Sequence, residues 1–277
     1  MCPDAPSLAD AAAEPLDAMP RWLPPLRGHH GLILGVANAH SIAWGIAQRC
    51  AIQGARLVLT CLNAKARAQV QPLADAIGAP LLECDVREPG ALAATVARAA
   101  ELLEGRLDFA VHSIAWAPLQ ELHGRVIDTS AEGYAQAMQV SCHSFAELAR
   151  CCEPHWPADG ATLLTVSYQG AVEAVPHYGL MGPVKAALES MVRYMALELG
   201  PRQVRVHALS PGPMPTRAAS GLTDFDGLMA DARRRAPLRR LVTLAEVGDA
   251  AAFLLGPGAA GMSGQTLYVD GGLHAVG

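Results

Sequence analysis

The chain has 277 residues, of which 51% are hydrophobic and 17% charged. This composition is typical of a globular protein with a substantial core, and it excludes disorder over most of the chain. A formal net charge of -5 gives no electrostatic case for nucleic acid or for an anionic membrane surface. We therefore expect a small-molecule partner, with no nucleic acid and no membrane.

The cysteines indicate a reducing compartment. There are seven of them, an odd number, and none forms a Cys-x-x-Cys pair. The N-terminal segment is acidic where a signal peptide needs a basic start, and no stretch reaches the ~18 apolar residues of a membrane span. The ten histidines are scattered, so no metal site is expected. These features predict a cytoplasmic protein.

The order of apolar segments predicts an α/β fold. Residues 1–30 are rich in Ala, Pro and Asp and are expected to form an N-terminal arm, with one domain over residues 31–277. Within the domain, apolar β-type runs alternate with segments long enough for crossover helices, which is typical of a parallel sheet covered on both faces. The runs lie at residues 32–34, 56–60, 80–84, 108–112, 162–166, 204–208 and 266–269. We predict a single doubly wound, Rossmann-type domain with a seven-stranded parallel sheet, and a ligand at the carboxyl ends of its strands, where strand order reverses.

The turn after the first strand is a candidate phosphate site. It runs from Gly35 through Ala37 to Ser41 and Ile42, where a helix is expected to begin. A helix N-terminus offers unpaired N–H groups and the positive end of its dipole, and the Ser41 hydroxyl could add a contact or cap the helix. The usual Gly-x-Gly-x-x-Gly pattern is missing, so a purely structural turn is an equal alternative.

The segment after the second strand leaves the choice of dinucleotide open. It has Leu62 and no acidic residue at the place where a carboxylate often binds the adenosine ribose. Lys65 and Arg67 could meet a 2′-phosphate, although two basic residues on an early helix are more often a solvated face. Both NADH and NADPH therefore remain candidates. Further cofactor contacts are expected directly after the third and fourth strands, at Asp85, Val86, Ser113, Ile114 and Ala115.

Tyr178 and Lys185 form the candidate catalytic pair. They are seven positions apart, so on a helix both would point from one face toward one ligand. A phenol is a weak acid near neutral pH, and a nearby ammonium group is expected to stabilise its ionised form and lower its pKa. The alternative is a partly buried tyrosine and a surface lysine. The position of the pair after the fifth strand favours catalysis.

With these segments the sequence resembles the short-chain dehydrogenase/reductase superfamily and, within it, the divergent enoyl-acyl-carrier-protein reductases. The resemblance covers about Gly31 to Gly272. Tyr168, ten residues before Tyr178, separates this group from ketone and alcohol reductases, which carry a serine thirteen residues before the tyrosine, where this chain has Thr165. Its other markers are the turns at 35–38 and 41–45, Cys84-Asp85-Val86, residues 112–118, residues 210–221 and the terminal Val269-Asp270-Gly271-Gly272.

The resemblance implies reduction of the trans-2 double bond of an enoyl thioester, carried on acyl carrier protein or coenzyme A, by NADH or NADPH in fatty acid biosynthesis. Tyr178 would donate to the thioester oxygen, Lys185 would bind the nicotinamide ribose, and Tyr168 would line the acyl site. A homotetramer and a mobile substrate loop at about 214–235 are also implied. The remaining implied contacts are Met214, Pro215, Thr216, Arg217 and Ala218 for the cofactor, and Ala117, Met181 and Phe225 for the substrate.

Several positions depart from the family pattern. His177 and Gly179 flank the tyrosine where asparagine is common, and Val172 replaces a usual charged residue. Pro183 lacks an N–H, so it must lie in the first turn of its helix or distort it. These changes surround the expected substrate pocket and are compatible with either the housekeeping enzyme or a specialised paralogue.

Five arginines within eight residues adjoin the expected substrate loop, namely Arg233, Arg234, Arg235, Arg239 and Arg240. They fit a dock for an acidic carrier protein or a pantetheine phosphate, and they fit a solvated helix end equally well.

Two competing functions use the same fold. A carbonyl or alcohol reductase would use Tyr178 and Lys185 equally well, and Tyr168 argues against it. A non-catalytic protein that senses the dinucleotide would have no need of the Tyr178 and Lys185 pair.

Overall fold

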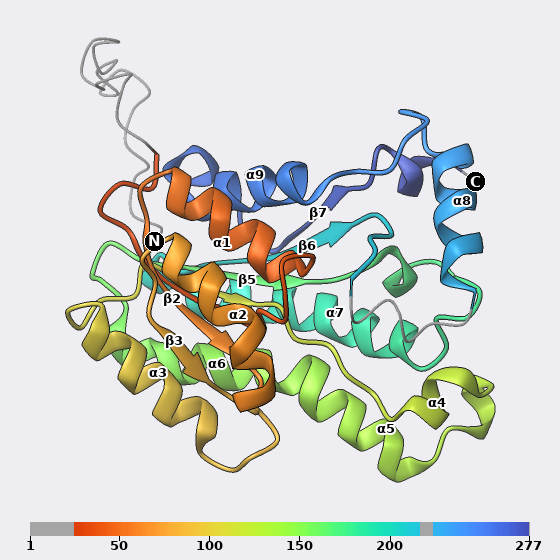
Figure 1. Ribbon diagram of the computed structural model, residues 1–277, viewed down its shortest axis with the longest axis horizontal. Helices are drawn as coiled ribbons and strands as arrows, with labels where there is room; N and C mark the ends of the chain where they lie inside the picture. Colours follow the sequence, from red (N-terminus) through yellow and green to blue (C-terminus); the bar gives the residue numbers. More distant parts are fainter. Residues whose placement is uncertain (1–24, 217–223, 277) are drawn as a thin grey trace, which may run out of the picture.

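The fold is a doubly wound α/β domain. The computed structural model describes residues 25–216 and 224–276. In this part of the chain, parallel strands form one seven-stranded sheet in the order β3-β2-β1-β4-β5-β6-β7 (Figure 1). The strands are β1 (His30–Leu34), β2 (Arg56–Cys61), β3 (Leu81–Glu83), β4 (Phe109–His112), β5 (Thr162–Val166), β6 (Arg205–Pro211) and β7 (Gln265–Val269). The predicted fold class is confirmed.

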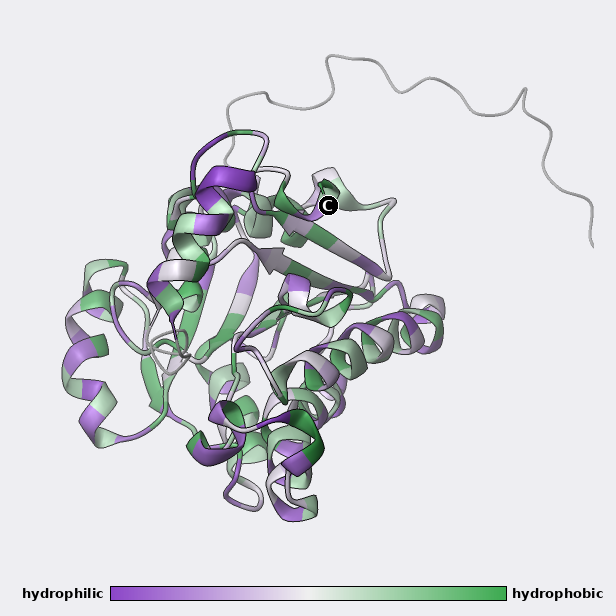
Figure 2. Ribbon diagram, turned by 90° about the vertical axis from the view of Figure 1, so that its right-hand side faces the viewer, coloured by the Kyte–Doolittle hydropathy of each residue, from purple (hydrophilic) through white to green (hydrophobic). Residues whose placement is uncertain are grey.

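Helices cover both faces of the sheet, because the strands are apolar on both sides. α1, α2 and α9 pack on one face, and α3, α5, α6 and α7 pack on the other. The helices are α1 (Ile42–Ile52), α2 (Ala64–Ala76), α3 (Ala91–Leu102), α4 (Leu119–His123), α5 (Ala131–Met138), α6 (Ser144–Cys152), α7 (Met181–Leu199), α8 (Phe225–Arg235) and α9 (Leu244–Leu255). In Figure 2 polar and apolar residues alternate along these helices, as expected of helices with one face on the sheet and one in solvent.

Short helical turns connect several of these elements. A π-helical turn, η2 (Gln139–His143), joins α5 to α6. The other turns are η1 (Val126–Asp128), η3 (Glu153–His155), η4 (Gln169–Ala171), η5 (Gly200–Arg202), η7 (Pro257–Ala259) and η8 (Leu273–Ala275).

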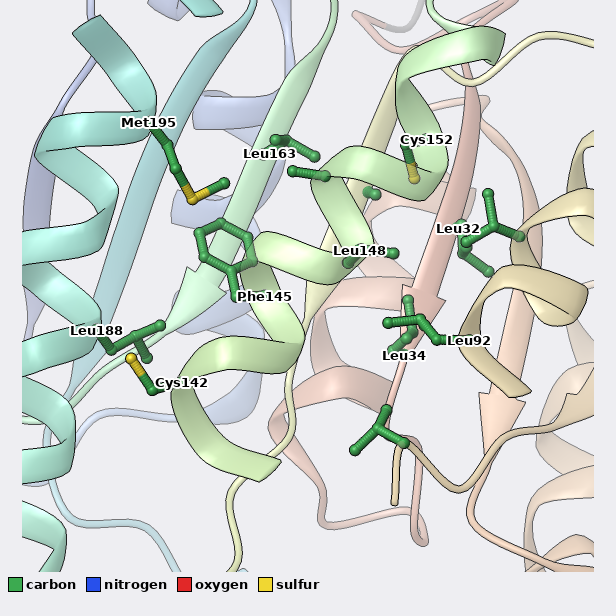
Figure 3. Close-up of a cluster of buried hydrophobic side chains, with 14 of the residues drawn as sticks. Leu32, Leu34, Leu92, Cys142, Phe145, Leu148, Cys152, Leu163, Leu188 and Met195 are labelled. Carbon is green, nitrogen blue, oxygen red and sulfur yellow. The ribbon is translucent and has the colours of Figure 1, made fainter. Parts of the chain in front are cut away.

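The core on the α6 and α7 face is built around Phe145. Figure 3 shows its ring between Met195 of α7 and Leu163 of β5, with Leu188 nearby. A second part of the same cluster brings Leu92 of α3 against the leucines of β1. Burying a side chain of this size stabilises the fold by ~1.5–3 kcal/mol. This packing fixes the strand ends from which the site residues extend.

The chain enters the sheet earlier than the expected boundary at residue 31. Leu26 is fully buried in the α1 and α9 core, and its N–H donates to the Gln53 carbonyl. Residues 25–30 of the expected arm therefore pack on the domain, and residues 1–24 lie outside the described part. Among the described helices, none is long and apolar enough to cross a bilayer.

Candidate active site

A cavity of about 660 Å³ opens at the carboxyl ends of β1 to β6. β1 lies between β2 and β4, where the strand order reverses. The cavity therefore lies where the sequence places the ligand.

Most of the predicted site residues line this one cavity. They are Gly35, Ala37, Ser41, Ile42, Leu62, Asp85, Val86, Ser113, Ile114, Ala115, Ala117, Tyr168, Tyr178, Met181, Lys185, Met214, Thr216 and Phe225. Pro215 is exposed and is not part of the lining, although its neighbours Met214 and Thr216 are. Arg217 and Ala218 lie outside the described residues. The expected substrate loop, 214–235, includes α8, whose Phe225 and Leu228 face the cavity.

The turn after β1 requires glycine at position 35. Gly35 has φ +90°, and a Cβ there would lie 2.2 Å from the Ser113 carbonyl oxygen at the end of β4. The Ser41 hydroxyl donates to the Asn38 carbonyl at 2.7 Å and does not cap α1, so the capping role considered for it is wrong. The first turn of α1 thus keeps N–H groups without a side-chain cap, which fits a pyrophosphate.

The end of the cavity beside Leu62, where an adenosine ribose is expected, holds one of the two basic residues considered for a 2′-phosphate. Lys65 lines the cavity. Arg67 pairs with Glu83, with Nε 2.7 Å from Oε1, and also donates to the Leu81 carbonyl. Leu62 is half exposed at the rim.

Arg87 and Trp116 are cavity residues that the sequence analysis missed. The Arg87 guanidinium holds both carboxylate oxygens of Asp85 and lies 5.5 Å from the Trp116 ring centroid. This hydrogen bonding lowers the pKa of Asp85, so the carboxylate that lines the cavity stays ionised. The position of Arg87, two residues after the predicted Asp85, could have indicated its contact with that carboxylate. Its contact with Trp116 could not be predicted in this way, because the two residues are far apart in the sequence.

The π-helical turn η2 fixes the loop after β4. Ser141 Oγ accepts from the Trp116 N–H at 2.7 Å and donates to the Trp116 carbonyl at 2.8 Å. Both backbone groups of Trp116 are therefore held, and with them the lining positions Ala115 and Ala117. The sequence carries no simple signal for this turn.

Tyr178 lies in a turn before α7, so the argument that it shares a helical face with Lys185 is wrong. His177 and Gly179 on either side have φ +62° and +50°. This left-handed region favours Gly and is tolerated by His and Asn, which explains why His177 and Gly179 can replace the family's asparagines. Tyr178 and Lys185 nevertheless meet in the same cavity.

The two tyrosines lie against each other, with ring centroids 4.8 Å apart. Burial raises the pKa of Tyr168 to about 12 and also raises the pKa of Tyr178, and the charges of Tyr168 and Glu189 raise the latter further. The expected lowering of the Tyr178 pKa by Lys185 is therefore wrong in this structure. A phenol that stays protonated is suited to donate a hydrogen bond.

Lys185 is buried and oriented by the end of β5. Its Nζ donates to the Val166 carbonyl at 2.6 Å, and burial lowers its pKa to about 8. The ammonium form still dominates at neutral pH. Pro183 lies in the first turn of α7, as predicted, because the early N–H groups of a helix have no partner within it.

Thr165 does not reach the cavity. It is fully buried, and its Oγ1 lies 3.0 Å from Nδ1 of His112, a ring that burial keeps neutral by lowering its pKa to about 3. At the position of the carbonyl-reductase serine, this chain therefore has a buried residue that hydrogen-bonds to His112.

The arginine cluster is mostly paired. Arg234 and Arg235 both contact Asp231, and Arg240 pairs with Glu246 at 2.5 Å. Arg239 donates to the Arg234 carbonyl. These pairings favour the solvated helix end over a preformed dock. No cluster of three or more His, Cys, Asp or Glu side chains suited to a metal is found in residues 25–216 and 224–276.

A doubly wound sheet with an uncapped helix at its first turn, and with a Tyr and a Lys meeting at the strand ends, defines a dinucleotide-dependent oxidoreductase of the short-chain dehydrogenase/reductase class. The sequence model of the family described as Enoyl-(Acyl carrier protein) reductase matches residues 35–274. The chain belongs to this enoyl-acyl-carrier-protein reductase family.

Individual relatives agree with this assignment. Enoyl-[acyl-carrier-protein] reductase [NADH] 1 of Rhizobium meliloti is 43% identical over 253 residues, covering 91% of this chain and 92% of the relative. The Escherichia coli K12 [NADH] enzyme is 41% identical over 249 residues, covering 89% and 94%.

Solved structures agree as well. The Anaplasma phagocytophilum reductase in complex with NAD has a TM-score of 0.86 at 43% identity, covering 91% of this chain and 96% of that one. The Bacillus cereus reductase with NADP+ and indole naphthyridinone has a TM-score of 0.88 at 37% identity, covering 91% and 99%.

Proposed function

We propose that the protein reduces the trans-2 double bond of an enoyl thioester with NADH, as an enoyl-acyl-carrier-protein reductase of fatty acid biosynthesis. The observation that carries this proposal is the Tyr168 and Tyr178 pair, whose rings contact each other at a tilt of 59° and which lines one cavity together with Lys185 and the turns expected to hold the nucleotide. The thioester would be carried on acyl carrier protein, as the names of the relatives state for those enzymes, or on coenzyme A.

The residues present fit a dinucleotide. Gly35, Ala37, Ser41 and Ile42 would hold the pyrophosphate, and Asp85 with Val86 would hold the adenine. Ser113, Ile114 and Ala115 would lie beneath the ribose and nicotinamide, and Met214 and Thr216 would flank them. When bound, the reduced nicotinamide supplies the hydride.

The chain's own residues stabilise the negative charge that develops on the thioester oxygen. Tyr178, kept neutral by burial, donates its O–H to that oxygen, and a preorganised donor of this kind lowers the barrier most as charge appears. Lys185 holds the ribose hydroxyls. Tyr168, Ala117, Met181 and Phe225 enclose the acyl chain and exclude water from the enolate.

The preference for NADH rests on the ribose end of the cavity. Arg67 is held by Glu83 in an ion pair, which removes one of the two cations that could meet a 2′-phosphate. The 2′-hydroxyl of NADH carries no charge, so its binding does not need a free cation at this position. The [NADH] relatives support the same choice.

We also propose a homotetramer in the cytoplasm. Tyr194 and Leu197 are large, exposed side chains on α7, and Phe253 is half exposed on α9. Such side chains fit subunit interfaces on two helices. The six described cysteines are all unpaired, which supports a reducing compartment. Light scattering after gel filtration tests the assembly.

The first experiment follows the loss of reduced-nicotinamide absorbance with a trans-2-enoyl thioester, with NADH and NADPH in parallel and a panel of simple ketones beside it. Enoyl-dependent oxidation with NADH supports the proposal. Turnover of ketones alone would identify a carbonyl reductase, and binding of the nucleotide without turnover of any substrate would favour a sensor.

A further inference from the structure

A buried carboxylate lies beside the proposed catalytic pair and has no role in the reaction described above. Glu189 is on α7, one helical turn after Lys185, and is 5% exposed. Its Oε1 accepts a hydrogen bond of 2.5 Å from Ser167 Oγ. Ser167 lines the cavity and directly precedes Tyr168.

α7 thereby holds two consecutive residues at the end of β5. Lys185 donates to the Val166 carbonyl at 2.6 Å, and Glu189 accepts from the next residue, Ser167. The Ser167 N–H donates to the Leu209 carbonyl of β6 at 2.7 Å, which fixes its backbone from the other side. The backbone from which Tyr168 extends is therefore fixed by both α7 and β6.

The charge of Glu189 is not neutralised by a direct partner. It forms no ion pair among the described residues, although a buried carboxylate costs stability unless something compensates for it. The titratable groups whose ionisation it affects are Lys185 on the same helix, Tyr178 in the turn before it and Tyr268 on β7. Its negative charge favours the ammonium form of Lys185 and the neutral form of Tyr178.

We propose that Glu189 is a positioning residue for the proposed reduction, which holds Ser167 through its hydrogen bond and faces the Lys185 ammonium and the Tyr178 phenol with its negative charge. The proposal rests on the function given above. It separates two effects, a mechanical one through Ser167 and an electrostatic one on Lys185 and Tyr178.

Two substitutions divide these effects. Glu189→Gln keeps an acceptor for Ser167 and removes the charge, whereas Ser167→Ala keeps the charge and removes the hydrogen bond. Glu198→Gln is the matched control, since Glu198 is exposed on the same helix. For each variant we would measure kcat/KM against pH, the pH dependence of the NADH dissociation constant, and the melting temperature.

For Glu189→Gln we expect the alkaline limb of kcat/KM to move to lower pH by about one unit, tenfold in the protonation equilibrium. The sign follows because activity needs a protonated Lys185 and a neutral Tyr178, and losing the negative charge lowers the pKa of both. NADH binding should weaken at the same lower pH. Ser167→Ala should reduce kcat about tenfold at all pH values without moving the limb.

An unchanged alkaline limb in Glu189→Gln, or an equal movement in Glu198→Gln, would overturn the electrostatic part. If Glu189→Gln fails to fold, Ser167→Ala decides: an unchanged kcat overturns the proposal, and a reduced kcat with an unmoved limb supports it. The NADH binding series distinguishes failure of this proposal from failure of the proposed function. If the wild-type protein turns over no enoyl thioester, its NADH affinity still reports the protonation of Lys185 in both variants.

Discussion

Gly170 allows the ring of Tyr178 to lie where it does, and its replacement by alanine tests the arrangement of the site. Gly170 is in η4, and a Cβ there would lie 2.4 Å from Cδ1 and 2.7 Å from Cε1 of Tyr178. The φ of Gly170 is not positive, so the backbone itself accepts alanine. The effect of Gly170→Ala should therefore come from contacts of the new Cβ, chiefly with Tyr178 and to a smaller extent with Cδ1 of Tyr168 at 3.3 Å.

The required displacement can be worked out from these distances. Ordinary van der Waals contact begins at 3.4 Å, so the ring must retreat by about 1 Å from its contact at 2.4 Å. A misplacement of about 1 Å can reduce a rate by about 100-fold, and overpacking of this kind costs ~1–3 kcal/mol of stability. We expect kcat with an enoyl thioester to fall by about 100-fold. NADH affinity should stay near the wild-type value, because Lys185, which is proposed to bind the nicotinamide ribose, is on α7 and does not move with the Tyr178 ring.

The assay compares single-turnover rates, NADH binding and thermal unfolding for Gly170→Ala and a control, Gly200→Ala. A Cβ at Gly200 meets nothing within 4 Å, and its φ is also not positive. The control should keep its rate and its melting temperature. Wild-type kcat in a folded Gly170→Ala protein would refute the view that the position of the Tyr178 ring controls the reaction.

Three further predictions follow from the site. Tyr178→Phe removes the donor to the thioester oxygen and should lower kcat by about 100- to 1000-fold, with NADH binding unchanged. Steady-state kinetics and a binding titration measure these two quantities, and retained turnover would exclude Tyr178 as the donor. Glu83→Gln releases Arg67 from its ion pair and should raise the ratio of NADPH to NADH kcat/KM several-fold, and an unaltered ratio would show that Arg67 does not reach the 2′-phosphate. His177→Val places a β-branched residue at φ +62° and should lower the free energy of unfolding in urea by ~1–2 kcal/mol, whereas His177→Gly should not.

The sheet could be predicted from sequence because strands buried on both faces are continuous apolar runs, and this sheet has seven of them. The predicted bounds of the strands were less accurate than their number and order. β6 extends to Pro211, beyond the predicted end at residue 208, because Ser210 and Pro211 still pair with Tyr268 and Val269 of β7. A proline at a strand end needs no N–H partner, so a segment that resembles a loop can continue a strand.

The cavity lining was predictable because the carboxyl ends of parallel strands meet at one edge. Side-chain contacts between segments far apart in the sequence could not be predicted. The hold of Ser141 on Trp116 spans 25 residues, and the hydrogen bond of Ser167 to Glu189 spans 22. The spacing of Tyr178 and Lys185 correctly predicted that both residues lie in one site, but the helix assumed for Tyr178 is absent. The turn around Tyr178 depends on residues with positive φ, which hydrophobic periodicity does not detect.

Tyr178 lies in a turn and Lys185 lies in α7. Under the proposed function, this division would separate recognition of the acyl chain from retention of the cofactor. The turn of Tyr178 adjoins α4, since a Cβ on Gly179 would lie 3.2 Å from the Leu122 carbonyl oxygen. Leu119 and Leu122 of α4 line the cavity. Under the proposed function, an acyl chain that displaces α4 would therefore move the phenol, while Lys185 would stay with the nucleotide. Acyl chains of different length should accordingly differ in their turnover rates, whereas the affinity for the nucleotide should not depend on the length of the acyl chain.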